Sequence, residues 1–513
     1  MTAELALAIV ATIEISLKWG GQIIQLCRTL EGADREIIER AVRVEACWVR
    51  ISKQLDFLRR TADLMEAEHL ELHQRTLEVL LNKLQVVRKE LESVSAIRTQ
   101  GDPRATCAGQ ESVLPGRKLK FALKKHRIDE AVDDLEKWQG VFDISWLLAL
   151  KIADQKLDTT LDQGFHSSSS SELSLRNVKA TFQKTQETRS IFLRGDGLAS
   201  AILTPMPCCE VTIAHRKDEL LILDTVVCNR MLAQATIKDV RSLAQNLQNN
   251  ETTIFGFLRC KGVMKEIKTE NAIRTTFLTI VFKVPPGLSE PVSLRASLMR
   301  GDFPESLSEK IKLARQLAKS VSYVHIFGFV HKNIRPETVI ITRNPSGSYT
   351  PFIVGFGKFR REDGLTQRYG DENWEKNLYR HPRRQGLKPE ETYVMQHDIY
   401  SLGVCLLEIG LWKSLVTYND EGKAEPQFTP AESTATSPRD PVACQNYLLA
   451  LAQNQLPKLM GSKYAEVVKT CLTCLDKDNE DFGDESEFMD EDGIIVGVRY
   501  IEKVILRLNS ISV

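Results

Sequence analysis

The chain has 513 residues, of which 68 are basic, 68 are acidic and 42% are hydrophobic. This length exceeds one ordinary core, so we expect two or three domains. The composition is typical of globular proteins and excludes a mostly disordered or membrane-embedded chain, while the balanced charge gives no overall field that would attract nucleic acid.

The eleven cysteines are scattered and show neither the spacing of a disulfide framework nor that of a zinc site. We therefore expect buried thiols in a reducing compartment, and no bound metal. The N-terminus carries Glu4 where a secretory signal would be basic, and no 18-residue apolar stretch free of charges predicts a constitutive membrane span. These features predict a cytoplasmic protein.

Residues 1–160 are predicted to form an all-α bundle. Apolar residues recur there at alternating steps of three and four, which is typical of amphipathic helices. The clearest such stretches are 51–65, 77–94 and 128–142. Because no alternating strand pattern interrupts them, we expect four or five helices packed together.

Six basic residues with no acidic residue among them precede the last of these helices: Arg117, Lys118, Lys120, Lys124, Lys125 and Arg127. Each such charge near an anionic lipid surface contributes about 1 kcal/mol to binding, so this basic cluster is a candidate lipid-binding site. A solvated helix face explains the same residues equally well, and both interpretations stay open.

Residues 161–195 are predicted to be a linker. They contain five consecutive serines at 167–171 and few large apolar residues. Such a sequence cannot bury enough surface to offset the entropy of ordering it, so we expect a domain boundary here.

The remaining residues, 196–513, change from strands to helices along the chain. Short β-branched runs predict strands at 210–214, 220–228 and 276–284, and apolar periodicity predicts helices at 311–324 and 399–409. This order is typical of an α+β fold. The acidic stretch 476–492 predicts a solvated loop, and a last amphipathic helix is predicted from Val498, Ile501, Ile505 and Leu508.

Four motifs in this region occur in the order and at the spacing of the protein-kinase family. HKNIRPETVI at 331–340 resembles the catalytic loop HRDLKPENIL, and Gly355-Phe356-Gly357 stands in the place of DFG. YRHPR at 379–383 looks like a degenerate APE region, and HDIYSLGV at 397–404 is similar to the start of the long central helix. The resemblance implies a two-lobed protein-kinase-like fold.

The same resemblance implies that the chemistry is missing. Phosphoryl transfer needs a carboxylate to orient the hydroxyl and two ligands for magnesium. Asn333, Thr338 and Gly355 stand at those positions. An asparagine amide is no base near neutral pH, and glycine has no side chain to bind metal. We therefore expect a pseudokinase that is not an enzyme and has no metal or obligatory cofactor.

Other motif residues keep the family's structural pattern. The resemblance implies that His331 and Phe356 join an internal hydrophobic spine and that Asp398 ties the catalytic loop to the central helix. Gly357 and Gly403 complete their motifs. Arg383 instead replaces the glutamate that anchors the family's activation segment, so this anchor is expected to be missing.

The elements that would bind ATP are weak. GDGLAS at 195–200 lacks the third glycine of a phosphate loop. Lys238, within ATIK, continues into a helical stripe, so it is predicted to lie near the start of a helix and not on the strand that should carry it. We expect no bound nucleotide, with residual ATP binding as the alternative.

The N-terminal region also resembles a known family. Its opening helix contains Gly20-Gly21, and residues 41–58 contain Trp48, a pattern similar to the HeLo-like domains of fungal cell-death and prion-associated proteins. A HeLo-like bundle joined to a pseudokinase resembles fungal relatives of the mixed-lineage-kinase-domain-like necroptosis executor. The resemblance implies an upstream activator, a homo-oligomer when active, and recruitment to an anionic plasma membrane. A weakly active or ATP-binding kinase and a cytosolic protein-binding scaffold are the alternatives.

Overall fold

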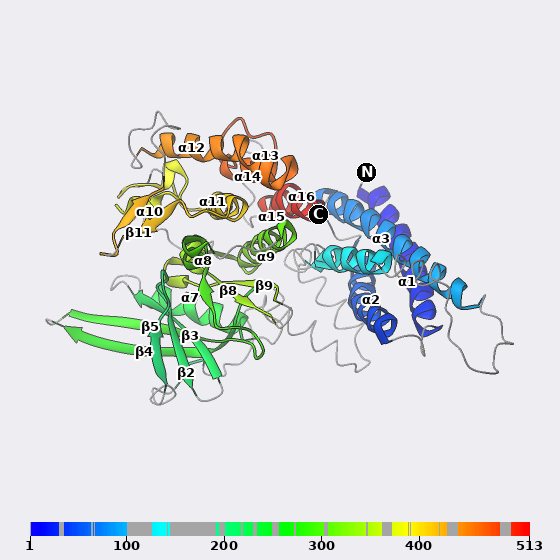
Figure 1. Ribbon diagram of the computed structural model, residues 1–513, viewed down its shortest axis with the longest axis horizontal. Helices are drawn as coiled ribbons and strands as arrows, with labels where there is room; N and C mark the ends of the chain where they lie inside the picture. The colour runs from blue at the N-terminus through cyan, green and yellow to red at the C-terminus, as the bar shows by residue number, and fades with distance from the viewer. Residues whose placement is uncertain are drawn as a thin grey trace, which may run out of the picture. The chain divides into compact units, whose positions relative to one another are not determined.

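Figure 1 shows the computed structural model of the chain, which divides into two compact units, Met1–His166 and Ser167–Val513. The structure describes residues 2–29, 35–62, 65, 67–99, 126–140, 142–143, 191–193 and 201–512, except for 217–218, 229–232, 249–255, 271–272, 302–305, 345–346, 362–371, 388, 390, 420, 428–439 and 483–493. The predicted linker 161–195 lies outside the described residues apart from 191–193.

The first unit is helical wherever the structure describes it. Its elements are α1 (Thr2–Thr29), α2 (Arg35–Thr61), α3 (Ala67–Thr99) and a helix over residues 126–140. Helix α1 packs against both α2 and α3. The predicted apolar stripes face inward, since Leu55, Leu80 and Leu135 are all buried.

One predicted helix boundary was wrong. The stripe 51–65 was expected to be helical throughout, but α2 ends at Thr61. The chain turns there, because the backbone N–H of Met65 donates to the carbonyl of Ala62. Ala62 is the last buried residue of the stripe, so the apolar pattern continues across the turn although the helix does not.

Gly20 has a packing role in α1. A Cβ atom on Gly20 would lie 2.0 Å from the ring of Trp48 on α2, so only glycine admits this ring against α1. The neighbouring Gly21 has no atom within 4 Å of its Cβ position. Gly20 and Trp48, both noted in the sequence, therefore contact each other where α1 packs against α2.

The second unit begins with an antiparallel sheet in the strand order β1-β2-β3-β5-β4. Its strands are β1 (Ile202–Pro205), β2 (Thr212–Arg216), β3 (Glu219–Cys228), β4 (Arg259–Glu270) and β5 (Ile273–Lys283). Figure 1 shows β4 and β5 as a long hairpin. The predicted strands 220–228 and 276–284 coincide with β3 and β5, whereas 210–214 begins too early, because the N–H of Met206 bonds to the carbonyl of Val211 and closes a turn.

Helices and short strands make up the rest of this unit. They are α7 (Ala233–Asn246), β6 (Val292–Ser293), α8 (Leu294–Arg300), α9 (Leu307–Ile326), β7 (Phe329–Val330), β8 (Val339–Arg343), β9 (Tyr349–Ile353), β10 (Arg360–Arg361), α10 (Trp374–Asn377), α11 (Met395–Leu411), β11 (Val416–Tyr418), β12 (Ala424–Pro426), α12 (Pro441–Asn454), α13 (Leu456–Met460) and α14 (Ser462–Leu472). Helix α11 packs between α9 and α14. Gly403 makes the second contact close, since a Cβ there would lie 2.8 Å from that of Cys471.

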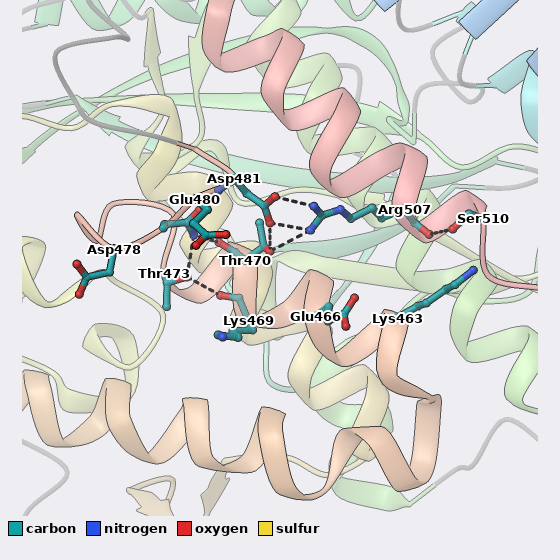
Figure 2. Close-up of a pocket in the computed structure, with 11 residues that line it drawn as sticks. Lys463, Glu466, Lys469, Thr470, Thr473, Asp478, Glu480, Asp481, Arg507 and Ser510 are labelled. Carbon is teal, nitrogen blue, oxygen red and sulfur yellow. Dashed lines mark hydrogen bonds and ion pairs between the residues drawn. The ribbon is translucent and has the colours of Figure 1, made fainter. Parts of the chain in front are cut away.

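The chain ends in one continuous helical stretch, formed by α15 (Ile494–Tyr500), a π-helical turn (Ile501–Leu506) and α16 (Arg507–Asn509). The four apolar residues that predicted it are buried. The acidic stretch before it is not all solvated as predicted: Phe482 is buried, and Arg507 donates two bonds of 2.6 Å to Asp481. This pair borders a polar pocket whose lining carries both charge signs (Figure 2), so the pocket indicates no particular ligand.

Candidate functional site

The segment that resembles a catalytic loop, residues 331–340, is held by bonds within itself and to Gly355. Asn333 Nδ2 donates to the carbonyl of Gly355 (3.2 Å), and its Oδ1 accepts from Arg335 Nε (3.1 Å). Thr338 Oγ1 donates to the carbonyl of Asn333 (2.6 Å) and accepts from the backbone N–H of Arg335 (3.2 Å). The polar side chains at the positions of the base and of one metal ligand are thus engaged in fixing the segment.

Gly355 is matched to Thr338. Its φ of +82° lies in the left-handed region, and a Cβ atom built on it would lie 2.4 Å from Cγ2 and 2.9 Å from Cβ of Thr338. Real Cβ atoms do not approach other atoms so closely. The methyl group of Thr338 therefore occupies the space that any side chain at 355 would need, including a metal-binding carboxylate.

Asp224, in the middle of β3, holds the same segment and was missed by the sequence analysis. Its carboxylate is 3% exposed, and Oδ2 accepts from the backbone N–H groups of Gly355 (2.8 Å) and Phe356 (2.9 Å). Burial raises the pKa of Asp224 to about 6, nearby Glu210 also raises it, and the two hydrogen bonds act in the opposite direction. A signal was present, because Asp224 is the only charged residue in the apolar run LLILDTVVC.

Lys238 lies within α7 and not on β3, in agreement with its helical periodicity. Residues 195–200, the weak candidate for a phosphate loop, lie outside the described residues.

The turn between β1 and β2 lies against the catalytic-loop-like segment. Glu210 Oε1 accepts from Arg335 Nη2 (2.8 Å) and lies 3.7 Å from Lys376 Nζ. Ser293 Oγ donates to the carbonyl of Pro207 (2.7 Å). The turn thus brings a carboxylate onto the one arginine of this segment, whose side chain is almost fully buried.

Asp398, at the start of α11, bonds to the same segment. Its carboxylate accepts from the backbone N–H groups of His331 (2.7 Å) and Lys332 (3.0 Å) and from the hydroxyl of Tyr393 (2.7 Å). Burial alone would raise the pKa of Asp398, but the hydrogen bond from His325 and the nearby imidazoles lower it below its ordinary value. The ionised carboxylate therefore joins α11 to residues 331–332.

His331 and Phe356 pack as aromatic neighbours, with ring centroids 4.8 Å apart. Phe356 also lies 6.2 Å from Phe282 and 6.5 Å from Phe257. Burial lowers the pKa of His331 to about 4, so its ring is neutral at physiological pH. Gly357, the last residue of this motif, has open space at its Cβ position apart from one carbonyl at 3.9 Å.

The segment around Arg383 is anchored, contrary to the expectation from its missing glutamate. Ser401 Oγ donates to the carbonyl of Tyr379 (2.7 Å), and the hydroxyl of Tyr379 donates to Glu408 (2.8 Å). Arg383 itself donates to Glu391 (2.8 Å). Other side chains thus attach this segment to α11.

A second cluster that sequence reasoning missed surrounds Arg295 of α8, whose side chain is 0% exposed. Its guanidinium donates to Glu408 (2.7 Å) and Glu337 (3.1 Å), and also bonds to Tyr379 and Ser414. The cluster joins α8, the catalytic-loop-like segment and α11. Because all of these residues are buried, the arrangement indicates a structural role.

The candidate lipid-binding residues are only partly placed. Arg127 is exposed at the start of the helix over 126–140, and the other five residues of the basic cluster lie outside the described residues. Among the described helices, Glu4–Arg28 is long and apolar enough to cross a membrane by length and composition, and only 28% of its most apolar window is buried. The sequence criterion, which allowed no charges, did not select this helix.

Comparison with known proteins points to kinases for part of the chain. No protein-family model matches it. A probable serine/threonine-protein kinase PknB of Lactococcus lactis is 22% identical over 200 residues, 36% of this chain and 28% of that protein. A probable serine/threonine-protein kinase of Dictyostelium discoideum is 23% identical over 176 residues, 32% of this chain and 26% of that protein. A protein kinase and PP2C-like domain-containing protein of Oryza sativa is 23% identical over 171 residues, 30% of this chain and 24% of that protein.

These matches establish weak, partial homology to protein kinases. The chain spans about a quarter of the length of these relatives. Its organisation, N-terminal helices followed by a region of mixed helix and sheet, is consistent with a kinase-like C-terminal part.

Proposed function

We propose that the C-terminal unit is a pseudokinase, a kinase-like domain that binds and regulates without transferring phosphate. The observation that carries the proposal is the fit between Gly355 and Thr338, which leaves no volume for a metal-binding side chain. The bonds of Asn333 and the contact of Glu210 with Arg335 add support, because they use the polar groups that would otherwise face a substrate.

The first test is an assay of phosphate transfer by the full-length protein. We expect no incorporation of radiolabel from ATP into the protein or generic substrates with magnesium or manganese, because residues 333, 338 and 355 supply neither base nor metal ligand. Incorporation that is lost when Thr338 or Lys238 is replaced would contradict the proposal and favour a weakly active kinase.

The fit itself can be tested with a matched pair of glycines. Gly301 has a similar φ of +68° but open space at its Cβ position. Both Gly355→Ala and Gly301→Ala should cost about 1–2 kcal/mol for the left-handed backbone. Gly355→Ala should cost measurably more in denaturant unfolding because of its contact with Thr338. Equal costs would mean that position 355 has room for a side chain.

For the N-terminal unit, the proposal is a HeLo-like bundle that acts on an anionic membrane when released by an upstream activator, as an oligomer. The apolar composition of α1, the Gly20–Trp48 helix contact and the basic cluster support it. In this proposal the C-terminal unit holds the bundle inactive or senses the activator, and the cytoplasmic protein is recruited to the plasma membrane on activation. A cytosolic scaffold is the alternative.

This proposal predicts a loss of lipid binding on charge reversal. Replacing Lys118, Lys120, Lys124 and Lys125 by glutamate in residues 1–160 should weaken binding to anionic vesicles far more than it changes helicity. Each charge contributes about 1 kcal/mol near such a surface, and the effect should fade as salt shortens the screening length to about 8 Å. Reversal of three exposed basic residues outside α1, Arg75, Lys89 and Lys137, is the control. Unchanged vesicle binding at low salt would favour the scaffold.

A further inference from the structure

Residues 191–193, near the end of the predicted linker, form an isolated β-bridge beside β4. The N–H of Val263 donates to the carbonyl of Ile191 and the N–H of Leu193 donates to that of Val263, both at 2.9 Å. Phe192 and Val263 thus form a parallel bridge. Because β4 is the last strand of its sheet, these bonds use backbone groups that an edge strand otherwise leaves unpaired.

The sequence of β4 provides a specific place for this strap, as we call residues 191–193. The pairing of β4 with β5 shifts register between Cys260 and Gly262. Gly262 has φ +152°, and a Cβ atom there would lie 2.6 Å from the carbonyl oxygen of Ile191 and 2.8 Å from Cγ of Leu193. Only glycine therefore allows the strap to approach, which gives this bulge a function.

The strap also contacts α7. Ile191 is 3% exposed, whereas Leu193 is 38% exposed, so one side chain is buried and the other faces outward. The guanidinium of Arg241, on α7, lies 5.7 Å from the centre of the Phe192 ring. Helix α7 in turn packs on β3, β4, β5 and β10.

We propose that the strap is a releasable contact that fastens the N-terminal part of the second unit to the β4 edge and to α7. Among the described residues, two backbone bonds and the buried Ile191 side chain hold the strap to β4, so we expect its local opening to cost far less than unfolding of the sheet. Displacing the strap frees an edge that accepts an extended segment in parallel orientation, and removes Phe192 from α7. A regulatory role of the strap rests on the proposed function, since that role assumes that the C-terminal unit controls the bundle. The contact of the strap with β4 does not depend on the proposed function.

Hydrogen exchange of the full-length protein tests the contact. Ile191→Asp should speed exchange of the Leu193 and Val263 amides at least tenfold. Burying the new carboxylate is unfavourable, so the strap should detach from β4. Amides of β3 should not change. Gly262→Val, on β4, should speed exchange of the same amides, because its side chain would collide with the strap. Ile267→Asp is the control, since Ile267 is a half-exposed residue farther along β4.

A synthetic peptide of residues 186–198 then tests whether the edge is a docking site. Added to the Ile191→Asp protein, it should restore protection of the Val263 amide, and the same peptide with Ile191→Asp should not. Unprotected Leu193 and Val263 amides in the wild type, or no acceleration in Ile191→Asp, would overturn the strap. We also expect faster exchange of α7 amides in Ile191→Asp, because Phe192 leaves that helix. Faster exchange at Leu193 and Val263 without any change in α7 would overturn the proposed contact with α7. None of these results depends on phosphate transfer or lipid binding, so failure here leaves the proposed function standing.

Discussion

Replacing Arg295 by alanine is expected to lower the free energy of unfolding of the C-terminal unit by about 3–5 kcal/mol, the usual cost of removing one partner from a buried ion pair. The guanidinium is 0% exposed and separates two buried carboxylates, those of Glu337 and Glu408. Without it, Glu408 loses its ion-pair partner among the described residues, and Glu337 keeps only Arg335, at 3.9 Å. Slow-exchanging amides of α11 would measure the change, since Glu408 lies on that helix.

Two further variants separate charge from packing at this cluster. Arg300→Ala, on the exposed end of the same helix, should change stability by no more than about 0.5 kcal/mol. Adding Glu337→Gln and Glu408→Gln to Arg295→Met should recover part of the loss, because it removes the uncompensated charge while keeping side-chain volume. A cost below about 1 kcal/mol for Arg295→Ala would show that the cluster is not buried and paired as described.

Local sequence patterns predicted where the helices and strands of this chain lie better than they predicted which residues contact one another. A period of three to four residues located α2, α3 and the last helix, because burying one face of a helix imposes that period. The same pattern could not place the end of α2, since the residues of the following turn are also apolar. The predicted strand 210–214 began too early for a related reason: β-branched composition does not reveal that Glu210 lies in the turn closed by Met206 and Val211 and bonds to Arg335.

The motifs located the residues of the candidate site, but not the interactions that fix them. Asp224 and Gly355 are separated by 131 residues in the chain, and Arg295 and Glu408 by 113. No local pattern specifies which distant groups meet. What the sequence did contain was a single charge in an otherwise apolar strand, at Asp224, and such a residue must be paired or neutral when it is buried.

Asp224 should make stability depend on pH in a window that can be stated in advance. An ordinary aspartate titrates near 3.8, while the pKa of Asp224 is raised by burial to about 6. The folded protein therefore keeps this proton at pH values where the unfolded chain has lost it. Its stability from this group is highest below pH 4, falls as pH rises from about 4 to 6, and then levels off. The difference between the two pKa values corresponds to about 3 kcal/mol.

Asp224→Asn removes this dependence without removing an acceptor oxygen for the N–H groups of Gly355 and Phe356. We expect the variant and the wild type to be similarly stable at pH 4, and the variant to be more stable by up to about 3 kcal/mol at pH 7, in parallel denaturant titrations. Glu266→Gln makes the same carboxylate-to-amide change at an exposed position of the same sheet and is the control. A difference between Asp224→Asn and the wild type that is the same at pH 4 and pH 7 would mean that the carboxylate of Asp224 is not desolvated. Asp224→Ala should instead destabilise the protein at pH 4, by about 1–3 kcal/mol, because it leaves two buried N–H groups without an acceptor. At pH 7 the removal of the buried charge should offset most or all of this cost. The pair of variants thus separates the cost of the charge from the benefit of the two bonds that hold Gly355 and Phe356 to β3.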